Sequence, residues 1–567
     1  MQQTPRQPGL RARHWLYALL GVVLLNAAVT FHNVWPTLGV HWPGELSVEV
    51  AVLLVALALW HGAVGAVPRV LKAVLCVLVV LFTLGRYADV TAPALYGRAV
   101  NLYWDGPQLA GVAAMLVRVA TVWQVAGICA GVITVLAVLY LLARWSLEWI
   151  DAVLRVHRGA RIGTAAVGAV LVGCFLLQQA GWMARVPRFS IPVSASYAWQ
   201  VERLVDALTG RAARGLPPSP ALHSSFARLA GADVLLVFME SYGSCTYDRP
   251  EFVRALAPAR ARLAAALHDT GRAAVSAFVS SPTFGGGSVL AHLTTLAGVE
   301  VRDQDRYALL MTQKRPTLVS VFGAAGYRTI AVMPGLQKPW PEGAFYGFDT
   351  IYGTDALGYR GPAFGWWRIP DQFSLAALDA RELQPRPRRP LFVFFPTVST
   401  HMPFAPTPPL QPDWQRVLSR QPFDAGPLAQ ALAQRPVWTD LGPAYVRSVA
   451  YFLDTLSSYL RAHPDDRSVL IVLGDHQPAA SVSGEGASWE VPVHVITRDP
   501  DILRSLQGAG FRPGLNPLHP ALGGMSALGP WLLAAFGGPA PVPGGAQAAI
   551  AGAAPVRGGA HAAITAD

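Results

Sequence analysis

Residues 281–298 read SPTFGGGSVLAHLTTLAG, a glycine-rich turn followed by the start of an apolar helix. The run Ala273–Val279 before them is short and apolar, which predicts a buried strand. The three glycines let the backbone turn tightly, and apolar residues recur at helical spacing after Ser288. Ser288 is therefore expected at a helix N-terminus, where unpaired amides favour an anion and a hydroxyl is placed to attack a phosphoryl or sulfuryl centre. A serine that only caps the helix is the alternative interpretation.

The same alternation of strand and helix extends from residue 232 onward. Strands are expected at Val234–Met239, Ala273–Val279, Thr329–Met333, Leu391–Phe395, Val469–Leu473 and Val493–Ile496. Helices are expected near 251–268, 288–297, 316–325, 371–382 and 443–462. This pattern predicts an α/β domain with a mostly parallel sheet and helices on both faces. Ligands of such sheets bind beyond the carboxyl ends of the strands.

The N-terminal part has a different composition, dominated by apolar runs. Hydrophobic residues make up 52% of the 567 residues and charged residues only 14%, which suits a membrane protein with a soluble part. Five membrane spans are expected at about 15–36, 47–67, 70–89, 122–143 and 162–182. The segment Gln108–Ala120 is apolar but short, and is expected to be a half-span or an interfacial helix.

The distribution of basic residues sets the expected topology. The formal net charge is +11, but the basic residues lie beside apolar spans and form no dense cluster, so no nucleic-acid partner is expected. Nine basic residues in short loops fall on the N-terminal side and three on the other, which places the N-terminus in the cytoplasm. Five crossings then place everything after Trp182 on the extracytoplasmic, periplasmic side of a multi-pass inner-membrane protein. Only Cys245 lies outside the spans, so no disulfide framework is expected.

These patterns divide the chain into five parts. The expected boundaries are a cytoplasmic N-terminus (1–14), a transmembrane domain (15–182), a connecting arm (183–231), a catalytic domain (232–536) and a disordered tail rich in Ala, Gly and Pro (537–567).

Polar residues that suit catalysis follow several of the predicted strands. Glu240 follows the first strand, Asp475 and His476 follow the run 469–473, and His401 follows the run 391–395 at a short distance. Glu240 could instead cap a helix, Asp-His pairs are common in surface turns, and His401 could simply pack in a loop. Together with Ser288, they could hold one divalent metal (Glu240, Ser288, Asp475 and His476) that activates the hydroxyl, with His401 binding phosphoryl oxygens or protonating a leaving group.

In this order the motifs resemble the sulfatase-like branch of the alkaline phosphatase superfamily, and most closely the lipoteichoic acid synthases and related membrane phosphoglycerol transferases. The resemblance covers roughly 232–500 and includes a strand ending in Glu, a Gly-rich turn with the nucleophile, Ser399-Thr400-His401-Met402-Pro403-Phe404, and Gly474-Asp475-His476. It implies Mn or a similar divalent ion, with Mg or Zn as alternatives. It also implies substrate-binding roles for Trp340, His401, His292 and Asp371.

The sequence also departs from this family. The nucleophile is Ser, where the synthases have Thr, and His292 occupies a place where they tend to carry an acid. Met333 and Glu342 replace a substrate-binding His and Arg, and an acid would repel a phosphate rather than clamp it. The Cys/Ser-x-Pro-x-Arg signature of true sulfatases does not occur in the sequence.

The sequence therefore predicts an anchored, metal-dependent transferase that forms a phospho-Ser288 intermediate. It would move a phosphoglycerol- or phosphoethanolamine-like head group from a membrane phospholipid to an envelope glycan, lipid or polymer. A hydrolase with the same site, acting as a phosphodiesterase or sulfatase-like enzyme, is the first alternative. An inactive envelope scaffold that binds glycans is the second.

Overall fold

A computed structural model describes residues 12–35, 37–96, 99–106, 109, 113, 122–182, 187–209, 216–365, 367–464 and 467–537. The chain divides into two compact units, Met1–Arg211 and Ala212–Asp567. The predicted half-span Gln108–Ala120, apart from Leu109 and Ala113, and the predicted tail beyond Gly537 lie outside the described residues.

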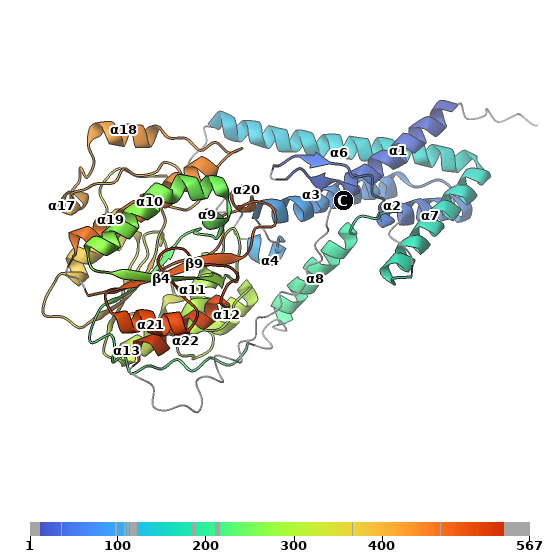
Figure 1. The fold of residues 1–567 in the computed structure, drawn as a ribbon. Coiled ribbons are helices and arrows are strands. Elements are labelled where there is room, and N and C mark those ends of the chain that lie inside the picture. The colour runs from blue at the N-terminus through green and yellow to red at the C-terminus, as the bar shows by residue number, and fades with distance from the viewer. Residues whose placement is uncertain are drawn as a thin grey trace, which may run out of the picture. The chain divides into compact units, whose positions relative to one another are not determined.

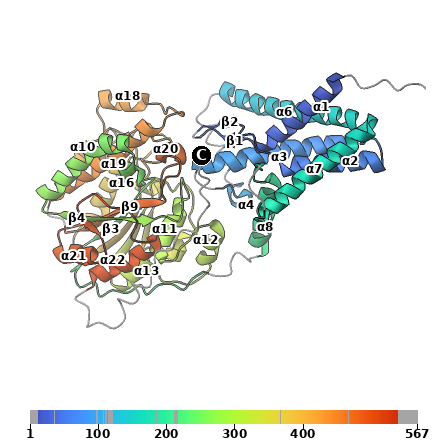
Figure 2. The same ribbon diagram turned by 45° about the vertical axis from the view of Figure 1, so that its right-hand side comes forward.

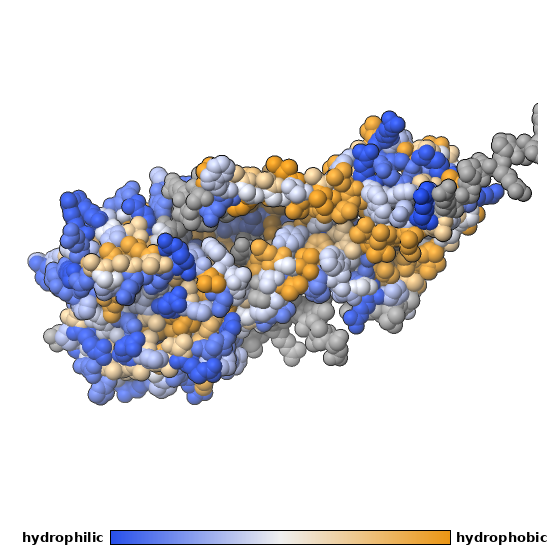
Figure 3. Space-filling model, turned by 90° about the horizontal axis from the view of Figure 1, so that it is seen from above, coloured by the Kyte–Doolittle hydropathy of each residue, from blue (hydrophilic) through white to orange (hydrophobic). Residues whose placement is uncertain are grey.

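The N-terminal unit is helical (Figures 1 and 2). Its elements are α1 (Ala12–Thr30), β1 (His32–Asn33), β2 (Val40–His41), α2 (Val48–Ala63), α3 (Arg69–Tyr96), α4 (Leu102–Asp105), α6 (Val122–Val156), α7 (Arg158–Gln179) and α8 (Val193–Thr209). In the described part of this unit, α1, α3, α6 and α7 are long and apolar enough to cross a membrane. Orange, apolar residues gather on the surface of these helices in Figure 3.

All five predicted spans coincide with helices, but α2 is shorter than expected. Its 16 residues rise about 24 Å, less than the roughly 30 Å of a bilayer hydrocarbon core. Val64 ends the helix, and the following Gly65 has a φ of 104°. A positive φ of this kind stops a helix, so the apolar run that continues to residue 67 is not helical throughout.

Buried polar contacts mark one end of this helical bundle. His61, near the end of α2, lies with its Nε2 2.8 Å from Asp151 Oδ1 of α6, and Lys72, in the first turn of α3, donates to Asp151 Oδ2 at 2.5 Å. Trp15, near the start of α1, stacks at 5.6 Å on His157, which precedes α7. The starts of α1, α3 and α7 and the ends of α2 and α6 therefore share one end of the bundle.

A second polar group marks the opposite end. Arg86 of α3 is buried and donates to the carbonyl of Phe31, directly after α1, at 2.8 Å, and to that of Ile191 at 3.5 Å. Glu49, at the start of α2, accepts a hydrogen bond from Ser194 N at 3.1 Å. The four long helices and the shorter α2 thus run in alternating directions between two polar ends.

The C-terminal unit is built around an eight-stranded sheet of order β10-β4-β9-β8-β3-β7-β5-β6. The strands are β3 (Val234–Met239), β4 (Ala273–Ser280), β5 (Arg328–Val332), β6 (Thr350–Tyr352), β7 (Leu391–Pro396), β8 (Val469–Gly474), β9 (Glu490–Thr497) and β10 (Arg512–Pro513). Neighbours from β8 to β6 pair in parallel, whereas β9 and β10 run against the others. The expected mostly parallel α/β sheet is confirmed.

Helices cover both faces of this sheet, as Figure 1 shows. They are α9 (Cys245–Asp248), α10 (Pro250–Asp269), α11 (Ser288–Ala297), α12 (Gln304–Met311), α13 (Leu318–Ala324), α14 (Gly343–Tyr346), α15 (Thr354–Leu357), α16 (Asp371–Leu378), α17 (Trp414–Val417), α18 (Ala425–Ala433), α19 (Gly442–Ala462), α20 (Ala480–Ser483), α21 (Pro500–Gly508) and α22 (Leu528–Phe536). A π-helical turn (Asp379–Leu383) extends α16, and a 3₁₀ turn (Met525–Ala527) precedes α22.

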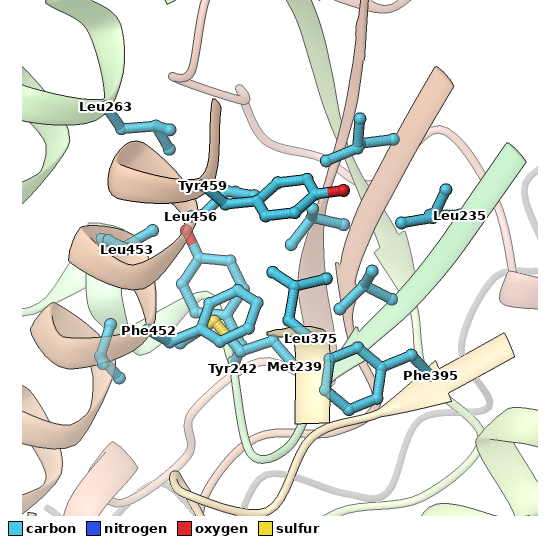
Figure 4. Packing of buried hydrophobic residues seen from close by; sticks show 14 of the residues in the cluster. Leu235, Met239, Tyr242, Leu263, Leu375, Phe395, Phe452, Leu453, Leu456 and Tyr459 are labelled. Atoms are coloured by element: carbon cyan, nitrogen blue, oxygen red, sulfur yellow. The ribbon is translucent and has the colours of Figure 1, made fainter. Parts of the chain in front are cut away.

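Two hydrophobic cores lie on opposite faces of the sheet, because successive side chains of a strand point to opposite faces. Leu235 and Met239 of β3 pack with Leu453 and Leu456 of α19 in one core (Figure 4). Leu236, which alternates with them, packs in the other core with residues of α11, α13, α21 and α22. Strands buried on both faces read as continuous apolar runs, which explains why they could be located in the sequence.

The end of β8 leaves no room for a side chain. A Cβ built on Gly474 would overlap the carbonyl oxygen of Tyr242, whereas one built on Gly323 of α13 meets nothing closer than Thr329 Cγ2 at 3.9 Å. We expect Gly474→Ala to destabilise the protein by at least about 3 kcal/mol, because the backbone must shift. Gly323→Ala, the matched control, should be neutral or stabilise by up to about 1 kcal/mol. Thermal melting of the purified full chain checks both values, and equal melting midpoints would contradict the packing described.

Candidate metal and nucleophile site

The register of two neighbouring parallel strands brings the first two candidate ligands together. Met239, the last residue of β3, pairs with Gly474, the last residue of β8, so Glu240 and Asp475 both follow the same edge of the sheet. With His476 they form a buried group whose ligand atoms all lie within 4.8 Å of one another. Among the described residues, this is the one group of three or more acidic, His or Cys side chains close enough to share a metal.

Ser288 is the first residue of α11, and its hydroxyl joins this group. Its Oγ donates to Glu240 Oε2 at 3.0 Å and lies 3.1 Å from His476 Nε2. Gly287, with a φ of 78°, is the residue before the helix, and no side chain caps the helix end. The hydroxyl therefore contacts the acidic and imidazole groups, and the residue at the N-cap position of α11 is Gly287 and not Ser288.

Backbone amides fix the carboxylate of Asp475. Its Oδ1 accepts hydrogen bonds from the amides of Ser241 and His476, both at 2.8 Å. Ser241 has a φ of 57°, a left-handed conformation that costs free energy in a non-glycine residue. The turn before Ser288 (residues 281–287, the nucleophile turn) is tied to the same segment, because Ser281 Oγ donates to the Asp475 carbonyl at 2.6 Å.

Hydrogen bonds also fix the tautomer of His476. Its Nδ1 lies 2.7 Å from the carbonyl oxygen of Gln477, which can only accept, so Nδ1 carries a proton. In the neutral ring, Nε2 then presents a lone pair toward Ser288 Oγ and Glu240. A histidine held in this way through its other nitrogen is the usual arrangement for a metal ligand.

The donor set fits a divalent metal ion. Asp475 Oδ2 is buried and has no hydrogen-bond partner among the described residues, and His476 Nε2 lies 3.6 Å from it. A buried carboxylate oxygen without a partner is costly unless a cation neutralises it. Two carboxylates, one imidazole and one hydroxyl suit Mn, Mg or Zn.

The electrostatics of the group lead to the same conclusion. Burial and the charge of Glu240 raise the pKa of Asp475 to about 7. Burial opposes the charging of His476, but Asp475 and Glu240 outweigh it and raise the pKa of His476 to about 9. Burial likewise opposes the ionisation of Glu240, but the hydrogen bond to His476 and the charge of that ring lower its pKa below the usual range. The two buried carboxylates repel each other, and a bound cation would relieve this repulsion.

His401 lies beside this group, on the loop that follows β7. Its positive form lowers the pKa of Glu240, although less than His476 does. Its Nδ1 lies 2.7 Å from the carbonyl of Met402, so in the neutral ring Nε2 is the free nitrogen. Trp367 contacts the imidazole edge-on with ring centroids 4.8 Å apart, and both line a cavity of about 30 Å³, about the share of one water molecule in the liquid.

The other three predicted substrate residues have different surroundings. His292, one turn after Ser288, is buried between the rings of Phe238 and Phe394, with centroids 4.5 and 5.3 Å away, and its Nε2 has no partner among the described residues. Burial lowers the pKa of His292 to about 3, so the ring is neutral. Trp340 packs against Tyr346 at 5.3 Å between ring centroids.

Asp371 directs its carboxylate at the chain itself. Its two oxygens accept hydrogen bonds from the amides of Val398 and Ser399, at 2.8 and 3.1 Å, and its own amide donates to Ser399 Oγ at 3.2 Å. Asp371 is 1% exposed, so these contacts leave it little access to a substrate. Burial raises the pKa of Asp371 to about 6, against the lowering effect of the amides.

Sequence reasoning missed several residues that shape the site. Thr397 Oγ1 accepts from the amide of Glu240 at 3.1 Å, and Ser241 and Ser281 hold Asp475 as described above. Trp367, four residues before Asp371, is another such residue, because its ring contacts His401. Gly335 makes room for it, since a Cβ there would lie 3.1 Å from the Trp367 ring. The position of Gly335, two residues after a predicted strand, was the one available signal.

Three solved structures resemble the chain in fold, all with low sequence identity. A protein in the alkaline phosphatase superfamily from Vibrio parahaemolyticus is 14% identical, with 59% of this chain and 75% of that chain covered and a TM-score of 0.36. The lipoteichoic acid synthase LtaP from Listeria monocytogenes is 14% identical, with 59% and 80% covered and a TM-score of 0.34. The Streptococcus pyogenes phosphoglycerol transferase GacH, in complex with sn-glycerol-1-phosphate, is 12% identical, with 53% and 74% covered and a TM-score of 0.33. No curated protein sequence matches the chain.

A family model gives the more specific result. The model of the sulfatase family matches residues 233–501. This range includes the nucleophile turn, the His401 loop and the Gly474-Asp475-His476 segment, which lie in the order that the sequence indicated. Residues 233–501 are therefore similar to the sulfatase family, as the ordered motifs indicate.

Proposed function

We propose that the protein is a membrane-anchored, metal-dependent phospho-group transferase. It moves a phosphoglycerol- or phosphoethanolamine-like head group from a membrane phospholipid to an envelope glycan, lipid or polymer, through a phospho-Ser288 intermediate. The observation that carries the proposal is the contact of Ser288 Oγ with Glu240 and His476, at 3.0 and 3.1 Å, within a buried three-ligand group.

Glu240, Asp475, His476 and the Ser288 hydroxyl would hold one divalent ion, Mn by family resemblance, or Mg or Zn. Such an ion supplies a Lewis acid that lowers the pKa of the hydroxyl and offsets charge on the phosphoryl oxygens. The chain contributes a fixed, buried set of donors, because Asp475 Oδ1 and His476 Nδ1 are already bonded to the backbone. Ligands held in this way need little rearrangement on binding.

In the first half-reaction, Ser288 Oγ forms a bond to phosphorus as the ester bond to the departing alcohol breaks. The serine proton is lost to solvent, and the departing alkoxide takes a proton from Nε2 of protonated His401. The Met402 carbonyl keeps the other nitrogen of His401 protonated and so leaves Nε2 for this task. Because Ser288 is the first residue of α11, the helix N-terminus faces the developing phosphoryl charge.

In the second half-reaction, the hydroxyl of the acceptor attacks the phosphoserine. His401, now neutral, takes the acceptor's proton at Nε2, and the bond between phosphorus and Ser288 Oγ breaks. Water in place of the acceptor gives a hydrolase, so the choice between transfer and hydrolysis depends on which hydroxyl reaches the intermediate.

A phospholipid donor suits a catalytic domain that is tethered to a bilayer. In this proposal the short helix α2 is a fifth crossing beside the four longer helices, and basic residues gather in the loops on the N-terminal side. We propose on this basis that residues 232–536 lie on the extracytoplasmic side. Met333 and Glu342 leave the identity of the head group open.

Asp371 and Trp367 would act as positioning residues for His401. The carboxylate of Asp371 accepts hydrogen bonds from the amides of Val398 and Ser399, three and two residues before His401, and the Trp367 ring lies against the imidazole itself. This interpretation replaces the expected substrate-binding role of Asp371 with an indirect one.

Replacing the nucleophile tests the central step. We expect Ser288→Ala to lower head-group release from phospholipid by at least about 1,000-fold, since the covalent route is lost. Ser288→Thr, which keeps a hydroxyl, should retain part of the activity. Mass spectrometry of wild-type protein quenched during turnover should find the head-group phosphate on Ser288. Intact head-group transfer by Ser288→Ala would defeat the proposal, and free head group without a conjugate would favour the hydrolase.

Metal content tests the ligand set independently of turnover. We expect Asp475→Asn to lose most of the bound divalent metal, because a neutral amide is a much poorer ligand than a carboxylate. Asp269→Asn, at an exposed position at the end of α10, is the control and should keep the wild-type metal content. Elemental analysis of the purified variants gives the measurement. A wild-type protein that binds no divalent metal would support the inactive scaffold instead.

The buried carboxylate of Asp371 gives a pH dependence with a definite sign. Its pKa is raised from the ordinary 3.8 to about 6, so the folded chain binds this proton more tightly than the unfolded chain between these values. Stability contributed by the protonated form is present below pH 3.8 and is lost as pH rises through 6. The melting midpoint of the wild type, relative to Asp371→Asn, should therefore fall by several degrees between pH 4 and pH 7. Parallel curves for the two proteins would contradict this assignment, and Asp269→Asn serves as the control that should follow the wild type.

A further inference from the structure

Four large apolar side chains are exposed around the nucleophile turn. Val289, directly after the nucleophile, is 42% exposed, and Trp489, directly before β9, is 43% exposed. Leu518 and Leu522, on the loop between β10 and α22, are 59% and 38% exposed. We call these four residues the apolar rim.

Hydrogen bonds place Trp489 against the nucleophile turn. Its carbonyl accepts from the amide of Ser281 at 2.9 Å, and its ring lies 5.7 Å from that of Phe284, between centroids. On its other side, the carbonyl of Ser488 accepts from Gln477 Nε2 at 2.9 Å. Trp489 is thus fixed to the turn that carries the nucleophile and to the residue after His476.

The two leucines lie on the same edge of the sheet. Glu490, the residue after Trp489, pairs with Ser280 in the register of β9 and β4, and its Oε1 accepts from the amide of Ala521 at 2.9 Å. Its other oxygen bonds His519 Nδ1, next to Leu518. Ser280, the last residue of β4, donates from its amide to the carbonyl of Gly523 at 2.8 Å. The segment that carries Leu518 and Leu522 is therefore bonded to Glu490, the residue after Trp489, and to the strand end from which the nucleophile turn begins.

Single exposed apolar residues are ordinary on protein surfaces, but four that gather beside one site are less so. In a phospholipid, the phosphate lies at the bilayer surface and the acyl chains lie below it. A site that takes such a phosphate must accommodate the apolar part of the same molecule next to it. Trp is favoured at this depth, because its ring is apolar and its N–H is polar.

We propose that the apolar rim binds the diacylglycerol part of the phospholipid donor while the phosphate reaches Ser288. This inference rests on the proposed function and deepens it, because it assigns a substrate that is embedded in a lipid surface rather than a soluble phosphoester. Two features favour a lipid as the ligand of the apolar rim. The rim lies next to the nucleophile turn, and the apolar helices of the same chain would keep the protein at a lipid surface.

The chain offers a matched control surface. Val437 and Trp438, on the segment between α18 and α19, are 60% and 66% exposed, more than the rim residues. Among the described residues, the backbone hydrogen bond of this pair is local: the Val437 carbonyl accepts from the amide of Asp440 and not from the nucleophile turn. A general effect of removing an exposed tryptophan should therefore appear equally in Trp438→Ala.

The first experiment compares two substrates with the full chain in detergent micelles. One is phosphatidylglycerol or phosphatidylethanolamine in mixed micelles, and the other is the water-soluble bis(p-nitrophenyl) phosphate. The ratio of kcat/KM for the lipid to kcat/KM for the soluble ester should fall at least 10-fold in a double variant carrying Trp489→Ala and Leu518→Ala. Trp438→Ala should leave this ratio at the wild-type value. An unchanged ratio in the double variant would overturn the inference.

The second experiment does not depend on turnover. Ser288→Ala protein is exposed to a phosphatidylglycerol analogue with a photoreactive diazirine in its acyl chain, irradiated and digested. Labelled peptides from the catalytic domain should come from residues 284–292, 484–490 and 515–524 and not from 434–441. Equal labelling of 434–441 would overturn the inference. A wild-type protein that turns over neither substrate, while still labelled at the rim, would instead overturn the proposed function.

Discussion

The structure depends on the convergence of two buried carboxylates and a buried imidazole around one partly buried serine hydroxyl. Glu240, Asp475 and His476 are all buried, and such a group is stable only if every donor and acceptor has a partner. Most of them find one in the backbone or in Ser288. Asp475 Oδ2 does not, which makes it the atom most in need of a cation. The strained backbone of Ser241 is part of what this arrangement costs, because that residue supplies one of the amides that hold Asp475.

The sheet makes this convergence possible by its register. The last residues of β3 and β8 are paired, so the residues after them must lie side by side. Gly474 lets the two segments approach, because its missing side chain leaves room for the Tyr242 carbonyl. β4 is separated from β8 only by β9, and its end starts the turn that carries Ser288. The site is thus a consequence of strand order and of close backbone packing, while the side chains supply its chemistry.

The parts of this arrangement that depend on a short stretch of sequence could be predicted. The contacts between residues far apart in the chain could not. Val234–Met239 and Val469–Gly474 are buried on both faces and read as continuous apolar runs, so both strands were located to within a residue. β6 and β10 have three and two residues, too few to show a pattern. The hydrogen bonds of Asp371 to the amides 27 and 28 residues further on could not be predicted, because no periodicity encodes such a pairing. The same holds for Trp367, whose contact with His401 depends on the space left by Gly335.

The nucleophile turn has three successive glycines with positive φ values of 65°, 141° and 78°. The position of the next Cα is therefore set by main-chain dihedrals that L-residues with side chains rarely adopt, and not by the packing of the side chain that follows. A threonine or a cysteine at position 288 would begin its side chain from the same point in space. Serine at this position therefore asks nothing of the fold that another hydroxyl or thiol side chain would not, so the group that meets Glu240 and His476 can change while the architecture stays the same.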